Sequence, residues 1–166
     1  GNFKPCYVIA EIGVNHNGKL DLAKQLIDES INAGANAVKF QKRHLQSIYR
    51  EESLENPNSE SQGFEILLAE LKEVELSQSD YYKIVEYCKE REITFLCTPW
   101  DKTSVDFLEK LETSAYKISS GDMTNFPLIK YISKTKKPII ISTGMAKIEE
   151  IEKMVYFVKM QNISFI

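Results

Sequence analysis

Two lysines interrupt otherwise apolar stretches of the sequence. Lys39 lies in "AVKFQ" and Lys117 lies in "AYKISSG". A lysine in a buried strand is costly unless its charge is paired or used. Because both lysines have amide or hydroxyl neighbours, the pair predicts an anion-binding site. The alternative for each lysine is that it reaches solvent at the end of its strand or pairs with a structural carboxylate.

Hydroxyl groups occur where similar apolar stretches end. Thr98, Ser120 and Ser142 with Thr143 end three of these stretches, and glycines follow two of them in "SSG" and "STG". Two ammonium groups, several hydroxyls and the backbone N–H groups of these turns suit a ligand that carries both a phosphate and a carboxylate. Each hydroxyl alone is better explained as a turn or capping residue. Their recurrence at three strand ends favours binding.

A carboxylate follows the first apolar stretch, in "EIGVNHNG" (11–18). Glu11 has small and apolar neighbours, so it must be paired or act on a substrate hydroxyl or amine. The two asparagines that follow orient a substrate or form turns, and Gly13 and Gly18 allow a tight backbone path. We expect a structural role for His16.

The elements that must position these residues form a repeating pattern. Apolar stretches at 7–13, 37–41, 93–99, 115–121 and 138–144 are each followed by an amphipathic helical segment. Such uniformly apolar stretches are typical of parallel strands covered on both faces. Apart from the long segment 42–76, strand starts lie about 22 to 30 residues apart, as in a (β/α)8 barrel. In a barrel all the polar strand ends meet at one mouth. A doubly wound sheet is the alternative.

The whole chain, residues 1–166, is therefore predicted to be an incomplete α/β barrel of the TIM type. It has about five βα units, and "NISFI" at its end is expected to begin a sixth strand. Five units cannot close an eight-stranded barrel. We expect a piece of a longer chain, or else edges that are covered by another copy or a different arrangement. The long segment 42–76 is expected to be functional or mobile, with a turn at 56–58 and a helix at 64–72.

Composition excludes some partners. The net charge of −3 comes from interspersed charges without a basic stripe, so nucleic acid is not expected. No apolar run approaches the roughly 20 residues of a membrane span and no leader is visible, so we expect a cytoplasmic protein without membrane contact. Cys6, Cys88 and Cys97 are expected to be buried thiols. His16 and His44, the only histidines, cannot build a multi-histidine metal site.

Five motifs in order and at characteristic spacing resemble the sialic acid synthase family: "AEIGVNHNG", "AVKFQ", "TP", "YKISSGDMTNFPLI" and "PIIISTGM". The resemblance implies a (β/α)8 barrel with a small C-terminal antifreeze-like domain and a domain-swapped homodimer. It implies condensation of phosphoenolpyruvate with an N-acylated aldohexose, such as N-acetylmannosamine, to a nine-carbon 2-keto sugar acid and phosphate. It also implies a divalent Mn²⁺ or Mg²⁺ ion. By this resemblance residues 1–166 would be the N-terminal portion of the barrel, and the remaining strands and the antifreeze-like domain would lie outside this chain.

The resemblance also assigns roles to residues. Phosphoenolpyruvate contacts carry over to Lys39, Thr98, Lys117, Ser120 and Ser142. Glu11 corresponds to an acidic sugar contact, Gln41 to a substrate-facing strand end, Asn58 to an amide from the long segment and Asp122 to an acidic group near the metal and the reacting centre. Glu11, Lys117 and Asp122 are the expected catalytic residues. The metal-binding histidines would lie outside this chain, and Ser119 replaces an expected glycine.

Two other hypotheses stay open. Lys117 could form a Schiff base in a sugar-acid aldolase if a dry pocket lowered its pKa. The chain could also be an inactive fragment.

Overall fold

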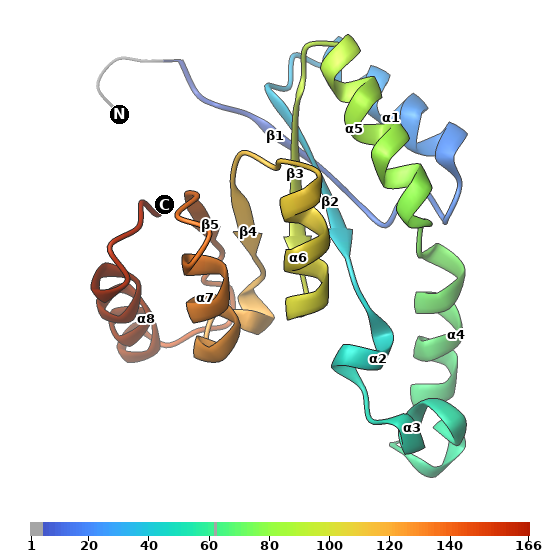
Figure 1. Ribbon diagram of the computed structural model, residues 1–166, viewed down its shortest axis with the longest axis vertical. Coiled ribbons are helices and arrows are strands. Elements are labelled where there is room, and N and C mark those ends of the chain that lie inside the picture. The colour runs from blue at the N-terminus through green and yellow to red at the C-terminus, as the bar shows by residue number, and fades with distance from the viewer. Residues whose placement is uncertain (1–4, 62) are drawn as a thin grey trace.

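The computed structural model describes residues 5–61 and 63–166 as a curved parallel sheet with helices packed along it (Figure 1). Hydrogen-bonded neighbours follow the chain order β1-β2-β3-β4-β5, and every pair is parallel. The strands are β1 (Ile9–Gly13), β2 (Ala37–Lys42), β3 (Thr94–Pro99), β4 (Tyr116–Ile118) and β5 (Ile139–Ile141). A doubly wound sheet reverses its strand order at a switch point. This order does not reverse, so the prediction of an incomplete barrel is confirmed.

Five helices connect or follow the strands. They are α1 (Leu20–Asn32), α5 (Gln78–Glu90), α6 (Lys102–Lys110), α7 (Phe126–Ser133) and α8 (Ile148–Met160). Local side-chain contacts and a proline define the starts of three of them. Ser77 accepts a hydrogen bond from the backbone N–H of Asp80, and Asp101 accepts one from that of Ser104. Pro127 lies in the first turn of α7, where its missing N–H costs nothing.

The last residues of the chain begin a sixth strand, as predicted. Phe165 forms a parallel bridge with Ile139 of β5. Backbone hydrogen bonds from Ile139 N to Ser164 O, and from Ile141 N to Ile166 O, continue the ladder. The edge of β5 is therefore already paired.

Side chains alternate between the two faces of the sheet. The outward set packs against the helices and forms the core, and its buried members include Val38, Phe40, Cys97, Tyr116 and Ile139. The opposite set includes Ile9, Leu96 and Ile140, which line an apolar cavity of about 440 Å³ together with Tyr7 and Ile166. The expectation of strands covered on both faces is confirmed for the central strands, because Lys39 of β2 and Leu96 of β3 are buried on this face as well. The outer strands β1 and β5 are only partly buried.

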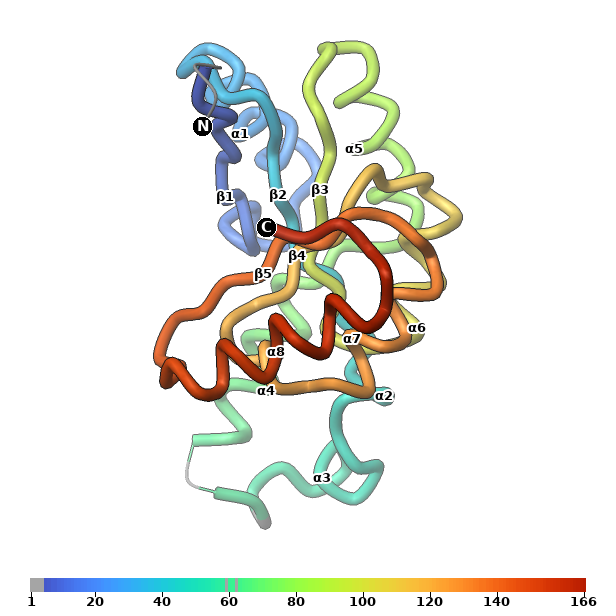
Figure 2. The backbone as a smooth tube through the Cα atoms, turned by 90° about the vertical axis from the view of Figure 1, so that its left-hand side faces the viewer, coloured from blue at the N-terminus to red at the C-terminus, as the bar shows by residue number. Residues whose placement is uncertain are grey.

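The long segment after β2 is mostly helical. It contains α2 (Leu45–Ile48), α3 (Glu51–Glu55), the 3-10 helix η1 (Pro57–Ser59) and α4 (Phe64–Val74). The helix predicted at 64–72 is confirmed as α4. Figures 1 and 2 show α3 at one end of the molecule, well beyond the carboxyl end of β2. We call the part of this segment from α2 to α4 the outlying arm, because it extends beyond the rim formed by the carboxyl ends of the strands.

Three smaller expectations have mixed outcomes. Cys88 and Cys97 are buried, but Cys6 is exposed because it precedes β1 and the core. His16 is buried, with its ring stacked on Phe40 at 5.7 Å between centroids. Within the part of the chain that the structure describes, no helix is long and apolar enough to cross a bilayer.

Candidate active site

The first part of the site joins β1, β2 and β3. Their register places Glu11 opposite Lys39 and Gln41 opposite Thr98. Lys39 Nζ lies 2.6 Å from Glu11 Oε2 and donates a hydrogen bond to Thr98 Oγ1 at 3.0 Å. The Lys39 side chain is only 7% exposed, whereas that of Glu11 is 52% exposed. A buried ammonium group is thus paired with a carboxylate that solvent or a ligand can reach.

The second lysine stands two strands further along the same rim. Lys117 is half-buried, and its Nζ donates to the carbonyl oxygen of Ile118 at 2.8 Å. Burial lowers the pKa of Lys117, the positive charge of Lys39 lowers it further, and Glu11 opposes the change. In the pairing of β3 with β4, Cys97 lies opposite Tyr116, so the next residues of these strands are Thr98, which accepts a hydrogen bond from Lys39, and Lys117. Both lysines therefore lie at one rim of the sheet.

The loops after β4 and β5 bring the serines together. Ser142 N donates to the Ile118 carbonyl at 3.1 Å, and this carbonyl also accepts from Lys117. A Cβ on Gly144 would lie 3.4 Å from Ser120 Cβ and 3.5 Å from its Oγ, so these loops pack closely. Lys117, Ser120 and Ser142 therefore form one group beside the Lys39 pair.

Two other predicted residues, Asp122 and Asn58, have different surroundings. Asp122 ends the 3-10 helix η2 (Ser120–Asp122), and its Oδ1 accepts from Asn125 Nδ2 at 3.0 Å. Asn58 is exposed in η1, on the outlying arm. Among residues 5–61 and 63–166, no ion pair links Asp122 to Lys39 or Lys117. Asp122 therefore stands two residues after Ser120 of this group, whereas Asn58 lies on the outlying arm.

Metal ligation is not supported by the residues that the structure describes. They contain no group of three or more His, Cys, Asp or Glu side chains that could hold an ion. Asp122 Oδ2 is buried without a hydrogen-bond partner among the described residues, so it could supply one oxygen ligand. One carboxylate does not make a site for Mn²⁺ or Mg²⁺, which need about six ligands, and we derive no step through such an ion.

Sequence reasoning missed a cation at the end of β2. Arg43 Nη2 donates to Gln41 Oε1 at 2.7 Å, and its guanidinium lies 4.5 Å from the centroid of the Trp100 ring. The available signal was the spacing: Arg43 follows Lys39 and Gln41 at steps of two, as residues that share one face of a strand do. The adjacent Lys42 points the other way, where it pairs with Glu75 after α4.

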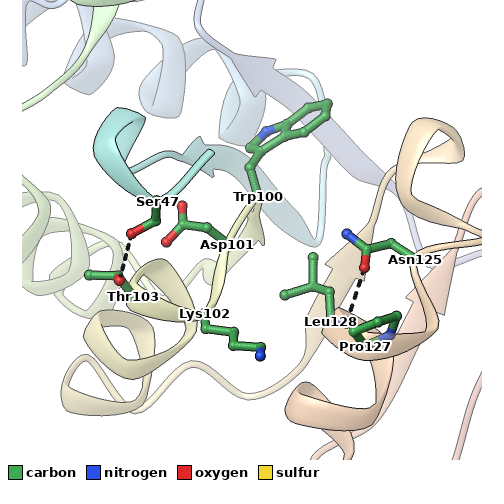
Figure 3. A pocket seen from close by; sticks show the side chains of 8 residues that line it. All are labelled: Ser47, Trp100, Asp101, Lys102, Thr103, Asn125, Pro127 and Leu128. Atoms are coloured by element: carbon green, nitrogen blue, oxygen red, sulfur yellow. Dashed lines mark hydrogen bonds between the residues drawn. The ribbon is translucent and has the colours of Figure 1, made fainter. Parts of the chain in front are cut away.

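The cavity beside this rim is a different feature. About 490 Å³ lies between the starts of α6 and α7 and beside α2 (Figure 3). Trp100, Lys102 and Asn125 are among its lining residues, but none of the predicted site residues is. The convergence of charged groups, and not this cavity, therefore defines the candidate site.

Parallel βα units in sequential order, with cations and hydroxyls at the carboxyl ends of their strands, define a barrel-type protein with a polar rim. Residues 26–165 match the NeuB family, so the chain belongs to this family.

Similar proteins with a named activity agree with this family assignment. The chain is 40% identical over 157 residues to N,N'-diacetyllegionaminic acid synthase of Campylobacter jejuni, covering 90% of this chain and 46% of that protein. It is 34% identical over 166 residues to N-acetylneuraminate-9-phosphate synthase of Homo sapiens, covering 99% and 46%. A crystal structure of an N-acetylneuraminic acid (sialic acid) synthetase from Leptospira borgpetersenii superposes with a TM-score of 0.83 at 29% identity, covering 98% and 53%. The chain thus spans about half the length of these proteins.

Proposed function

We propose that this chain is the N-terminal part of a barrel enzyme that condenses phosphoenolpyruvate with an N-acylated aldohexose. The product would be a nine-carbon 2-keto sugar acid, with release of phosphate. The observation that carries the proposal is the convergence of Lys39 and Lys117 with three hydroxyl residues at one rim. The names of the relatives, N-acetylneuraminate-9-phosphate synthase and N,N'-diacetyllegionaminic acid synthase, support the product class.

The chemistry assigns work to the residues of this chain. C3 of phosphoenolpyruvate attacks the aldehyde carbon of the open-chain sugar, water adds at C2, and phosphate leaves with cleavage of the C–O bond. Lys39, Lys117 and the hydroxyls hold the phosphate and the carboxylate and stabilise the charge that develops. Glu11, the exposed member of its ion pair, positions the sugar or moves a proton. The divalent ion that the resemblance implies would take its histidine ligands from outside these residues.

The test is substitution of Lys117 in the full-length protein. Lys117→Ala removes a charge-assisted contact worth about 1.5–3 kcal/mol, so we expect the KM for phosphoenolpyruvate to rise by roughly 10- to 100-fold. Lys130→Ala on the exposed side of α7 is the matched control and should leave kinetics unchanged. The assay is phosphate release together with the mass of the product for each candidate N-acyl sugar. An unchanged KM in Lys117→Ala would remove Lys117 from this role.

A Schiff-base aldolase is a second candidate because the pKa of Lys117 is lowered. Borohydride in the presence of a keto-acid substrate would trap a covalent adduct on Lys117 in an aldolase, and no adduct would form in a condensing synthase. Release of free phosphate from phosphoenolpyruvate would support the condensing synthase and count against the aldolase. Assaying the 166-residue chain beside the longer protein would show whether this chain is active alone.

A further inference from the structure

Arg43 is held in a fixed place at the end of β2. Its guanidinium lies against the ring of Trp100, 4.5 Å from the centroid. Trp100 is itself tied to this strand, because its backbone N–H donates to the carbonyl of Lys42 at 3.1 Å. A planar guanidinium on an indole face gains cation–π attraction and loses rotational freedom. Arg43 therefore presents its N–H groups in a defined direction.

That direction is toward Gln41. Arg43 Nη2 donates to Gln41 Oε1 at 2.7 Å. An arginine has donors only, so the amide atom that faces it must be the oxygen. The contact therefore decides which way the carboxamide of Gln41 points, which a glutamine alone would leave open.

The NH2 group of Gln41 then points into the site. A Cβ on Gly13 would lie 3.3 Å from Gln41 Nε2 and 3.1 Å from Glu11 Oε1, so both polar atoms border the space that this glycine leaves open. Gly13 has φ +58°, a conformation that suits glycine. The resulting arrangement offers a ligand one amide donor beside one carboxylate acceptor.

We propose that Arg43 is a positioning residue that fixes the carboxamide of Gln41 with its NH2 toward the bound substrate. The substrate atom that it recognises is an acceptor oxygen, a hydroxyl or a carbonyl, next to the group that contacts Glu11. This inference rests on the proposed function for the identity of the substrate. The orientation of Gln41 does not depend on that function.

The test has a readout that needs no turnover. In the full-length protein without substrate, the side-chain ¹⁵N–¹H2 signals of Gln41, assigned by their loss in Gln41→Ala, should shift in Arg43→Met. Arg43→Lys, which keeps a cation and a donor near Trp100, should shift them less. Unchanged Gln41 signals in Arg43→Met would overturn the proposal. Shifted signals without any condensation of phosphoenolpyruvate would support the positioning role and refute the proposed function.

Kinetics supply the second readout. Arg43→Met and Gln41→Ala should each raise the KM of the same substrate by roughly tenfold, with a smaller change in kcat, and the double variant should be no worse than Gln41→Ala alone. Additive losses would overturn the proposal, because they would show that Arg43 acts independently of Gln41. Gln41→Glu serves if Arg43→Met does not fold, since it keeps an acceptor for Arg43 but removes the NH2 donor. It should raise the same KM, and wild-type kinetics in Gln41→Glu would also refute the idea.

Discussion

Gly18 should be the glycine of the first loop that least tolerates a side chain. Its φ is +67°, and a Cβ built on it would lie 2.3 Å from the backbone carbonyl oxygen of Glu73, near the end of α4. The left-handed conformation costs alanine about 1–2 kcal/mol. The contact with a backbone atom cannot be relieved by a rotamer change, so we add about 1–3 kcal/mol for overpacking. We expect Gly18→Ala to lower the free energy of unfolding by about 2–5 kcal/mol, measured by urea denaturation.

Gly34 provides a matched control for this experiment. It has a similar φ of +82°, but a Cβ added to it would meet nothing within 4 Å. Gly34→Ala should therefore show only the conformational cost of about 1–2 kcal/mol. The difference between the two variants measures the packing of the first loop on α4. Equal destabilisation of Gly18→Ala and Gly34→Ala would refute the close approach of this loop to α4.

Three further predictions follow from buried groups. Burial lowers the pKa of His16, so the unfolded state binds the proton more readily than the folded state. The contribution of His16 to stability is therefore complete above about pH 6.5 and declines as the pH falls below this value. His16→Phe should flatten this decline in urea titrations, and an equally steep decline in the variant would contradict the prediction. In a thiol titration at about pH 8, the exposed Cys6 should react at once. Cys88 and Cys97 should react only after unfolding, because burial raises the pKa of both thiols, that of Cys88 to about 12. Rapid reaction of all three thiols would contradict the burial of Cys88 and Cys97. Asp101→Ala should lower the free energy of unfolding by about 1–3 kcal/mol, because the carboxylate caps α6 and also accepts a hydrogen bond from the backbone N–H of His44. A decrease of less than about 0.5 kcal/mol, which is typical of a surface substitution, would contradict this prediction.

The sequence predicts the strands well because their signal is local. Each strand is a short apolar stretch, and the helices between them start at residues such as Ser77 and Asp101 whose side chains cap the first turn. Polar residues at the ends of the stretches could be assigned to one rim, since parallel strands present their carboxyl ends on the same side. The convergence of Lys39 with Lys117 follows from this topology.

Features that depend on contacts between residues far apart in the sequence are harder to predict from the sequence. The role of Arg43 requires Trp100, which lies at the end of a different strand, and no local sequence pattern predicts this contact. Uniform hydrophobicity predicts that a strand is covered on both faces, but it does not distinguish helices on the second face from a barrel interior. Asn58 was assigned by resemblance, and its place on the arm depends on how α3 and α4 pack, which the sequence pattern of 42–76 does not specify.

The ion pair between Lys39 and Glu11 bears on how an anion could enter the proposed site. A buried ammonium group that lost its counter-charge would pay a large desolvation cost, so a ligand that displaced Glu11 would have to bring a negative charge in its place. Thr98 also contacts Lys39 and is itself buried, so it can keep its hydrogen bond throughout the exchange. Glu11 is the partner that solvent reaches, and its release frees a carboxylate next to the incoming anion. On the proposed function, binding of phosphoenolpyruvate would therefore prepare Glu11 to meet the sugar, which favours an order in which phosphoenolpyruvate binds first.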